Sequence, residues 1–415
     1  FASGWFFDPD ERLAAVIAVD HGLEDAEISA RWRTFGGRAE LAGEVRSVKR
    51  FAVHLPRRQR AVAPEAVSIR IMLGSGENHL IHAPAVPSDL QSRRSAILSS
   101  IAPHACDSET FADVYEPAIA PLQQALNERQ AVSDVRQFGV ASDRKVSIII
   151  PLYRETGFIR SQLMAFSVDA FLRDHGEIVY VVDDPLIALK VRALIEAAAI
   201  AFPLDLKLVT LERNGGYALA NNLGVGEAEG QTLVLMNSDV VPTASGWIEA
   251  ALARLDTLPA ASIIGPKLLY GDGSLQHAGM YFERLGSGYW QNYHFWKGYG
   301  ARFEAACHER VVPAVTGACM ILAKDDFLAV GGFTTDYVIG DYEDSDLCLK
   351  LRDRGGVPLY MPSIALYHFE RQSMPDDADG RDQGSTVYNR ALHTLRWNDR
   401  IEAANAATAE AQDAR

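Results

Sequence analysis

The sequence has few cysteines, and their spacing argues against both a zinc-binding protein and a disulfide-stabilised one. The four cysteines are Cys106, Cys307, Cys319 and Cys348. None of them forms a CxxC motif, so the sequence indicates neither a structural zinc site nor a disulfide framework. We interpret them as the reduced thiols of a cytosolic protein.

The sequence also lacks a long apolar run and an excess of basic residues. The longest apolar candidate, VPAVTGACMILA at 312–323, is shorter than the roughly 20 residues that a helix needs to cross a bilayer. The 54 acidic residues outnumber the 40 basic ones, which gives a formal net charge of −14. Because nucleic acids are bound through clustered Lys and Arg, we expect no nucleic-acid partner. We expect a protein of the cytoplasm, either free or at the inner face of the membrane.

The chain has 415 residues, 48% of them hydrophobic, which is enough for two or three domains with buried cores. Residues 1–85 contain short β-type runs between glycine turns and are predicted to form a small β-sandwich. Residues 86–143 are predicted to form a helical connector, 144–385 the main α/β domain and 386–415 a helical tail. Because the chain begins at Phe1, we interpret it as a fragment of a longer protein with further domains.

The aromatic residues of the N-terminal region allow two interpretations. These residues either line a carbohydrate-binding surface or pack in the core of the small domain; they are Trp5, Phe6, Trp32, His54, His79 and His82.

From residue 146 onward, apolar strands alternate with amphipathic helices. Such alternation predicts a mostly parallel sheet with helices on both faces. The predicted strands are 146–150, 178–182, 206–210 and 232–236. In open α/β sheets, ligands bind outside the carboxyl ends of the strands, so we expect the site at that edge.

Three of these strands end in polar residues. The first is followed by Tyr153, the second by Asp183 and Asp184, and the fourth by Asn237 and Asp239. Asn237 and Asp239 either cap the next helix or hold a hard cation in the cleft. The repetition at three strand ends favours a ligand site over capping alone.

Two other stretches have the composition of binding sites. Asn214, Gly215 and Gly216 precede a helix, so the backbone there either approaches a diphosphate or forms an ordinary strand-to-helix turn. Residues 284–310 show no clear period and include Trp290 and Trp296, and we interpret them as the side of the acceptor.

The stretch GDYEDSDLCLKLRDRG, at 340–355, predicts a helix with acidic residues at its start. Asp344 precedes Leu347 and Cys348 by three and four residues and therefore shares their inward face. Asp346 stands four residues before Lys350, the spacing of a surface ion pair. Asp344 is therefore the acid that we expect in the cleft, unless it only complements the helix dipole.

The ordered motifs VSIIIPLYRE, EIVYVVDD, LERNGGYALANNLG, QTLVLMNSD and GDYEDSDLCLKL together resemble those of the family 2 glycosyltransferases, over roughly 145–375. The resemblance implies the GT-A fold, an inverting transfer, a nucleotide-diphosphate sugar donor and a divalent metal, Mn²⁺ or Mg²⁺. It also implies a glycan or lipid-linked glycan acceptor and a role in bacterial surface polysaccharide synthesis. The residues that match are Pro151 and Tyr153 in the nucleoside pocket, Asp184 at the base, Asn214 and Asn237 at the donor, Asp239 and His368 at the metal, and Asp344 as general base.

Two other functions are compatible with parts of this pattern. One is a catalytically inactive, transferase-like protein that binds carbohydrate or serves as a scaffold. Because Asp239, Asp344 and His368 are all present, the pattern favours the enzyme. The other is a nucleotidyltransferase, which needs a basic, glycine-rich loop after the first strand, and PLYRETG lacks one.

Overall fold

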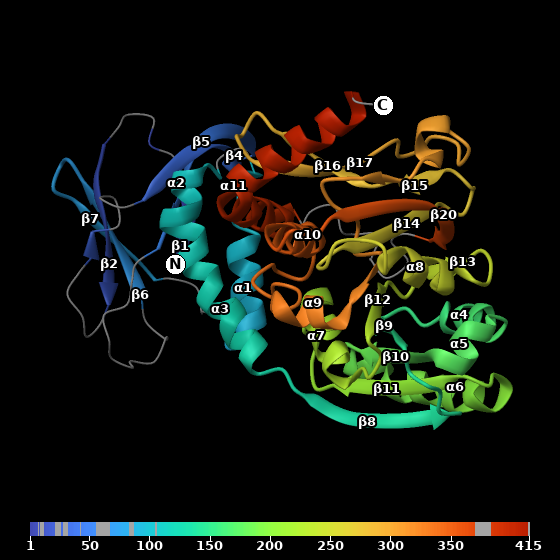
Figure 1. Ribbon diagram of the computed structural model, residues 1–415. Helices are drawn as coiled ribbons and strands as arrows, with labels where there is room; N and C mark the ends of the chain where they lie inside the picture. Colours follow the sequence, from blue (N-terminus) through green and yellow to red (C-terminus); the bar gives the residue numbers. More distant parts are fainter. Residues whose placement is uncertain are drawn as a thin grey trace. The chain divides into compact units, whose positions relative to one another are not determined.

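The structure is a computed structural model, which describes residues 1–6, 8, 12–20, 26–27, 32–41, 43–54, 67–82, 87–103, 106–369 and 383–413. The chain divides into two compact units (Figure 1). Unit 1 is Phe1–Leu126 with Asp379–Tyr388, and unit 2 is Asn127–Ala378 with Asn389–Arg415. Within the described stretches, every helix is too short or too polar to span a bilayer.

Unit 1 contains two antiparallel sheets, which confirms that the N-terminal region is rich in β-structure. Val16 of one sheet and Val53 of the other lie in one small buried cluster, and Trp32 packs against it. The rings of Trp32 and Phe6 stack 5.3 Å apart, so these two aromatics pack on each other. One sheet has the order β1 (Ala2–Phe6), β5 (Glu44–Val53), β4 (Arg33–Leu41), and the other has the order β3 (Ala26–Glu27), β2 (Leu13–Asp20), β6 (Val67–Leu73), β7 (Asn78–His82).

Helices follow these two sheets in the chain. Asp89 begins the first by accepting a hydrogen bond from Ser92 N at 2.7 Å, and Asp107 begins the second by accepting one from Thr110 N at 2.7 Å. Such caps satisfy the free N–H groups of a helix start. The helices are α1 (Leu90–Leu98), α2 (Ser108–Thr110) and α3 (Glu116–Glu128), with the π-helical turn Phe111–Tyr115 before α3.

The predicted helical connector at 86–143 is wrong over its last part. Val132–Gly139 form strand β8, which pairs antiparallel with β11 (Asp205–Leu211) at the edge of the sheet of unit 2. Burial alternates residue by residue along β8, as expected for a strand with one covered face. Unit 2 therefore begins earlier than the predicted boundary at 144.

Unit 2 is built on a sheet that has 11 strands in the described part of the chain. Its parallel centre has the order β12-β9-β10-β11, and this confirms the predicted α/β sheet. Antiparallel neighbours extend it on both sides. The path runs β13 (Val240–Pro242), β20 (Pro358–His368), β14 (Ile263–Leu269), β19 (Cys319–Ala323), β12 (Thr232–Met236), β9 (Val146–Leu152), β10 (Gly176–Val182), β11, β8, with β15 (Leu275–His277) beside β14 and β18 (Arg310–Val311) beside β20.

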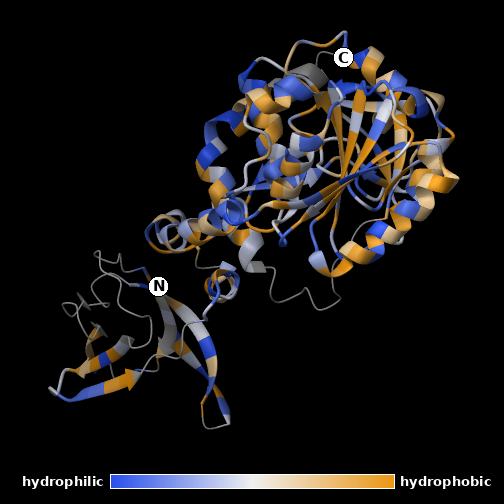
Figure 2. Ribbon diagram, turned by 90° about the horizontal axis from the view of Figure 1, so that it is seen from below, coloured by the Kyte–Doolittle hydropathy of each residue, from blue (hydrophilic) through white to orange (hydrophobic). Residues whose placement is uncertain are grey.

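The central strands are buried on both faces. Along β9, Ile148 and Ile150 belong to one apolar cluster and Ile149 to the other, so successive side chains pack on opposite faces. Figure 2 shows the hydrophobic residues running along these strands. The first cluster includes Phe166 of α4, and the second includes Val225 of α7. The helices of this part are α4 (Ile159–Ser167), α5 (Ala170–His175), α6 (Ala188–Ala201), α7 (Tyr217–Glu227), α8 (Trp247–Leu255), α9 (Lys324–Ala329), α10 (Glu343–Asp353) and α11 (Gln383–Asp413), whose first residues count with unit 1.

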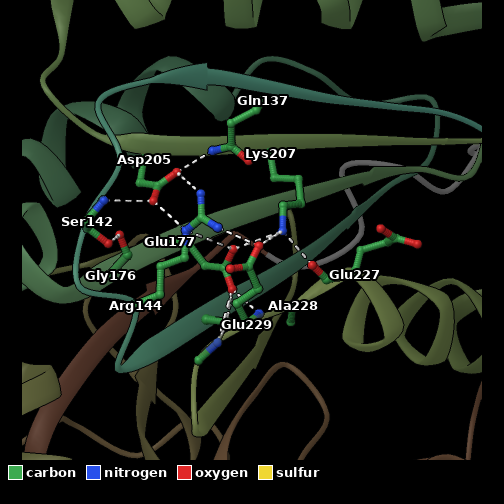
Figure 3. A network of polar contacts seen from close by, with 12 residues as sticks. Gln137, Ser142, Arg144, Gly176, Glu177, Asp205, Lys207, Glu227, Ala228 and Glu229 are labelled. Atoms are coloured by element: carbon green, nitrogen blue, oxygen red, sulfur yellow. Dashed lines mark hydrogen bonds and ion pairs between the residues drawn. The ribbon is translucent and has the colours of Figure 1, made fainter.

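A network of charged residues holds the amino ends of the parallel strands (Figure 3). Arg144 Nε donates to Asp205 Oδ2 at 2.7 Å, and Lys207 Nζ lies 3.3 Å from Glu177 Oε2. Glu177 and Asp205 are completely buried, so losing a cationic partner would leave a buried charge uncompensated. The network fixes the edge of the sheet opposite to the carboxyl ends of the strands.

The stretch 284–310, predicted to be irregular, contains a strand. Strands β16 (Met280–Arg284) and β17 (Trp290–His294) pair as an antiparallel hairpin. Trp290 is 7% exposed, and its Nε1 donates to Asn398 Oδ1 of α11 at 3.1 Å. Because that partner lies about a hundred residues away in the chain, local sequence could not reveal it.

Candidate active site

The three polar strand ends lie at one edge of the sheet, because β12, β9 and β10 are parallel neighbours. Tyr153 follows β9, Asp183 follows β10, and Asn237 follows β12. The strand order therefore brings together the residues that the sequence predicted to form a ligand site.

Asp239 and His368 are in direct contact, as predicted for a pair that would share a cation. Val240 of β13 is paired with His368 at the end of β20, and this register sets the two side chains together. His368 Nε2 lies 3.2 Å from Asp239 Oδ1. Both side chains are buried, so their arrangement is fixed by packing.

A buried glutamine holds the turn between Asn237 and Val240. Gln162 of α4 donates from Nε2 to Asn237 O at 3.2 Å and to Val240 O at 2.9 Å. Its Oε1 accepts from Tyr180 Oη at 3.2 Å. The sequence analysis missed Gln162, although an amide among the apolar positions of a helix is a signal of such a role.

The residues of this turn fit a divalent cation. Two buried atoms beside this turn, Asn237 Oδ1 and His368 Nδ1, have no hydrogen-bond partner among the described residues. With the Asp239 carboxylate they offer oxygen and imidazole donors. The described part of the chain contains no group of three His, Cys, Asp or Glu residues that could hold a metal. One carboxylate with an amide oxygen beside it resembles the sites of Mg²⁺, which is bound through one or two carboxylates and completes its shell with phosphate oxygens and water.

Asp344 stands in the first turn of α10. Its Oδ2 accepts from Gly317 N at 3.0 Å, and its Oδ1 accepts from Ser345 N at 2.7 Å. Burial raises the pKa of Asp344 above its usual range, against the effect of these N–H groups. A Cβ on Gly317 would lie 3.2 Å from Tyr217 Oη and 3.3 Å from Asp344 Cβ, so the backbone approaches the acid closely.

Glu343, the neighbour of Asp344, is an acid that the sequence analysis did not weigh for the cleft. It is buried, and among the described residues its Oε2 has no hydrogen-bond partner. Burial, followed by the charge of Asp344, raises the pKa of Glu343 well above its usual value. Glu343 and Asp344 are neighbouring buried acids, so their protons titrate as those of a pair.

The predicted ion pair between Asp346 and Lys350 is present, but the prediction that it lies at the surface is wrong. Lys350 Nζ does lie 3.2 Å from Asp346 Oδ2, but Asp346 is only 1% exposed. Its carboxylate also accepts from Tyr337 Oη at 3.0 Å and from Trp397 Nε1 at 2.7 Å. Although burial acts to raise it, the charge of Lys350 and the hydrogen bonds from Thr334 and Trp397 keep the pKa of Asp346 below its usual value. Asp346 is a structural acid in the interior.

One short segment contacts both the acid and the cation turn. Gly317 N donates to Asp344, and the next residue, Ala318, accepts from Asn237 N at 3.0 Å through its carbonyl oxygen. The two residues just before β19 therefore contact Asp344 on one side and the turn that contains Asp239 on the other. The acid predicted as the base and the pair predicted to hold a cation are therefore joined through one short segment.

The sequence of unit 2 matches a known family. Residues 147–327 match the model described as glycosyl transferase family 2. This region is a family 2 glycosyltransferase domain. The match confirms the resemblance inferred from the ordered motifs.

Individual relatives support the family. The chain is 27% identical over 252 residues to the O-antigen biosynthesis protein RfbC of Myxococcus xanthus, covering 58% of this chain and 18% of that protein. It is 28% identical over 210 residues to the N-acetylglucosaminyl-diphospho-decaprenol L-rhamnosyltransferase of Mycobacterium tuberculosis, covering 46% of this chain and 65% of that protein. The chain thus spans less than two thirds of the length of either relative. A crystal structure of GalNAc-T7 with UDP, GalNAc and Mn²⁺ is similar at 17% identity and a TM-score of 0.48, over 62% of this chain and 50% of that one.

In the family 2 domain, the two acids after β10 have different contacts. Asp183 Oδ1 accepts from Gly215 N at 2.6 Å, and its Oδ2 accepts from Gly216 N at 2.9 Å. Burial raises the pKa of Asp183 to about 7, although these two hydrogen bonds lower it. Asp184, the acid predicted to bind the base, caps the 3₁₀ turn that follows by accepting from Leu186 N at 3.0 Å.

The turn before α7 does not present its N–H groups to a diphosphate. Gly215 and Gly216 donate theirs to Asp183, and Tyr217 N donates to Ile339 O at 3.0 Å. The diphosphate interpretation of this turn is therefore wrong for its backbone, and the glycines serve packing instead. A Cβ on Gly216 would lie 2.6 Å from Ile339 O, and the φ of this residue is +82°. Asn214 is exposed, and its role at the donor stays a prediction.

Pro151 and Tyr153 lie at the end of β9 as the resemblance required. Pro151 is paired with Val181 of β10. Tyr153 is 37% exposed, and the guanidinium of Arg154 lies 4.9 Å above its ring. An exposed aromatic ring beside a cation can stack on a nucleobase, so the assignment to the pocket wall stays a prediction.

The aromatic residues assigned to the acceptor side make internal contacts. Trp290 is buried and donates to Asn398 of α11, so its interpretation as part of the acceptor side is wrong. The ring of Trp296 lies 4.0 Å from the Arg310 guanidinium. His294 Nδ1 lies 2.9 Å from His277 Nδ1.

Proposed function

We propose that this chain is an inverting glycosyltransferase, which moves a sugar from a nucleotide-diphosphate sugar to a hydroxyl of a glycan or lipid-linked glycan. The observation that carries the proposal is the contact of Gly317–Ala318 with Asp344 on one side and with the Asn237–Asp239 turn on the other. It supports a single site in which a base faces a cation-bound leaving group. The family match supports the reaction class.

The proposed reaction is one displacement at the anomeric carbon. The acceptor oxygen forms a bond to this carbon while the bond between the carbon and the phosphate oxygen breaks. The bonding electron pair leaves with the nucleoside diphosphate, and Asp344 takes the proton of the acceptor hydroxyl. Because the acceptor attacks from the side opposite to the leaving group, the anomeric configuration inverts. Burial raises the pKa of Asp344, and a raised pKa makes a carboxylate a better proton acceptor.

Asp239 and His368 are the residues that would hold a divalent cation, Mn²⁺ or Mg²⁺, with Asn237 beside them. Such a cation would neutralise the charge that develops on the departing diphosphate. Gln162 keeps the turn of these residues in place through two carbonyl groups. Pro151, Tyr153, Asp184 and Asn214 are proposed to line the donor pocket.

The names of the relatives support a role in bacterial surface polysaccharide synthesis. One is named for O-antigen biosynthesis, and the other for transfer of L-rhamnose to a decaprenol-linked acceptor. We place the reaction in the cytoplasm, at or near the inner face of the membrane. All four cysteines are free in the structure, which agrees with a reducing compartment. The β-rich region of unit 1 is proposed to orient the acceptor.

A thermal-shift screen tests the proposal. The chain is melted with UDP, dTDP, GDP and CDP, each with Mn²⁺ and again with excess chelator. A ligand that binds the native state raises the melting temperature, so we expect one nucleotide to raise it with Mn²⁺ and the chelator to remove the rise. If none of the four nucleotides changes the melting temperature with Mn²⁺, the proposed function is wrong. Release of nucleoside diphosphate from the matching sugar donor then separates an enzyme from an inactive scaffold.

A further inference from the structure

The loop before α10, residues 338–342, contains three residues other than glycine with positive φ. Ile339, Asp341 and Tyr342 have φ values of +68°, +88° and +77°. Such left-handed conformations cost of order 1–3 kcal/mol each in residues other than glycine, and they persist only where the surrounding structure enforces them. The loop ends where α10 begins, two residues before Asp344. Whatever holds the loop therefore also sets the position of Asp344.

A single buried amide of α11 holds most of this loop. Asn389 Oδ1 accepts from Val338 N at 2.8 Å, and Asn389 Nδ2 donates to Val338 O at 3.1 Å. The same Nδ2 donates to Gly340 O at 2.7 Å and approaches Asp341 O at 3.4 Å. Asn389 is completely buried. Its side chain pairs with Val338 as a neighbouring strand would, and it stabilises a backbone that has no sheet partner there.

The same face of α11 continues along the start of α10. Arg390 Nε donates to Tyr342 Oη at 3.1 Å, and His393 Nε2 lies 3.0 Å from Ser345 Oγ. Trp397 then donates to Asp346, as described above. Positions 389, 393 and 397 recur every four residues, so one side of the helix contacts the loop and the first turn of α10 in order.

The opposite side of the loop contacts the donor side of the cleft. Ile339 O accepts from Tyr217 N at 3.0 Å, next to the two glycines that donate to Asp183. A shift of the loop would therefore move Asp344 relative to Gly317 and disturb the start of α7 as well. The loop connects the proposed base to the strand ends that carry the donor residues.

We propose that Asn389 is a positioning residue for the transfer reaction. It holds 338–342 in the left-handed backbone that begins α10 with the Asp344 carboxylate against Gly317 N. The inference rests on the proposed function, and it concerns a helix that lies outside the matched region 147–327. Asn389 does not contact substrate in this account and acts only through the loop.

The substitution Asn389→Asp tests this role, because it keeps the shape and the acceptor but replaces the donor Nδ2 by an oxygen that faces carbonyl groups. Asn405→Asp is the matched control, since Asn405 Nδ2 of the same helix donates to Phe282 O at 2.9 Å, away from the loop. The assay is release of nucleoside diphosphate from the nucleotide sugar that the wild type turns over, with Mn²⁺. We expect Asn389→Asp to lower kcat by about 10²-fold, the scale of a catalytic group misplaced by about 1 Å, with KM for the donor within about twofold. Asn405→Asp should leave both constants near those of the wild type.

Amide hydrogen exchange of the loop peptide gives a readout that does not need activity. We expect exchange within 334–346 to become faster in Asn389→Asp than in Asn405→Asp, because Val338 O and Gly340 O lose the Nδ2 donor that holds the loop. If the wild type turns over no sugar nucleotide, the proposed function fails, and the exchange result alone decides whether Asn389 holds the loop. Equal exchange in the two variants overturns the inference, as does an unchanged kcat or a parallel loss of kcat and donor affinity.

A second variant covers the case in which Asn389→Asp does not fold. Tyr342→Phe removes the hydroxyl that Arg390 Nε contacts at 3.1 Å and keeps the buried ring. It should lower kcat by about tenfold at unchanged donor KM, since the start of α10 then loses one of its hydrogen bonds to α11. An unchanged kcat in this variant counts against the inference.

Discussion

At the scale of single residues, the two acids that begin α10 differ from the acid that follows them. Asp344 accepts only backbone N–H groups, whereas Asp346 is engaged by Lys350, Thr334, Tyr337 and Trp397. A carboxylate with several side-chain partners is fixed as an anion, and its pKa lies low. A buried carboxylate with few partners is a better proton acceptor. Asp344 also contacts Gly317 beside the Asn237–Asp239 turn, so we assign the chemistry to Asp344.

Substitution of these acids should separate chemistry from stability. Asp344→Asn should lower transfer by roughly 10²- to 10⁴-fold, the range for a lost general base, while the nucleotide still binds. Asp346→Asn should instead lower the melting temperature, because it removes one half of a buried ion pair. Initial rates and thermal melts of both variants check this. The assignment fails if Asp346→Asn folds with wild-type stability but is inactive while Asp344→Asn turns over normally.

The pH dependence of the reaction should report Asp344. A base acts only when deprotonated, and burial raises the pKa of this group above the usual range of an aspartate. The rate should therefore fall as the pH is lowered through a value higher than the roughly 3.9 of a free aspartate. A profile of kcat/KM against pH in the wild type measures this limb. The limb should be absent from the residual activity of Asp344→Asn, and a limb that remains there would belong to another group.

At the scale of elements, the site is built where strands, turns and helix starts meet. The order β12-β9-β10 brings the polar strand ends together, and β13 pairs with β20 to set Asp239 against His368. Asp183 then ties the end of β10 to the turn before α7 through Gly215 N and Gly216 N. Each contact joins two elements, so the site depends on the register of the sheet.

Asp183 should make the stability of unit 2 depend on pH. Its pKa in the folded protein, about 7, lies above the unfolded value of 3.8. The folded state therefore holds the proton more tightly, and the stability this contributes is present below the unfolded pKa and is lost as the pH rises through about 7. The melting temperature of the wild type should fall relative to that of Asp183→Asn between about pH 5 and about pH 8. A difference that stays constant over this interval would contradict the raised pKa.

The sequence predicted the elements that carry the site better than it predicted the contacts between the residues of the site. Asp239, His368 and Asp344 were predicted from strand ends, an apolar stripe and a family resemblance, and the structure does bring Asp239 and His368 together. The interior position of Asp346 could not be predicted, because i,i+4 spacing identifies Lys350 but not Trp397. The polar partners of Gly215 and Gly216 were missed for the same reason, since they lie about thirty residues away. Local patterns predict elements, whereas long-range hydrogen bonds decide which polar groups remain for a ligand.

At the scale of the whole molecule, the division into two units predicts which part carries the chemistry. All residues assigned to the donor, the cation and the base belong to unit 2. Strand β8 also belongs to it, and Gln137 of β8 contacts Asp205 in the buried charge network. The catalytic part should therefore begin before β8 rather than after it.

Two truncated chains test this boundary. A chain of residues 127–415 keeps β8 and should still release nucleoside diphosphate from the donor slowly, whereas a chain of residues 140–415 exposes the edge of β11 and should aggregate or melt at a lower temperature. Solubility, melting temperature and donor hydrolysis are measured for both. If the longer chain is also insoluble, unit 2 needs residues of unit 1 to fold.

The measurement that tests the central claim most directly is release of nucleoside diphosphate from UDP-, dTDP- and GDP-linked sugars by the wild type and by Asp239→Ala. The account predicts that the wild type turns over at least one donor with Mn²⁺ and that a chelator stops the reaction. It also predicts that Asp239→Ala is inactive while its melting temperature without ligand stays close to that of the wild type, since the residue stands at a strand end rather than in the apolar core. Turnover that is unaffected by the chelator, or an active Asp239→Ala, would contradict the account.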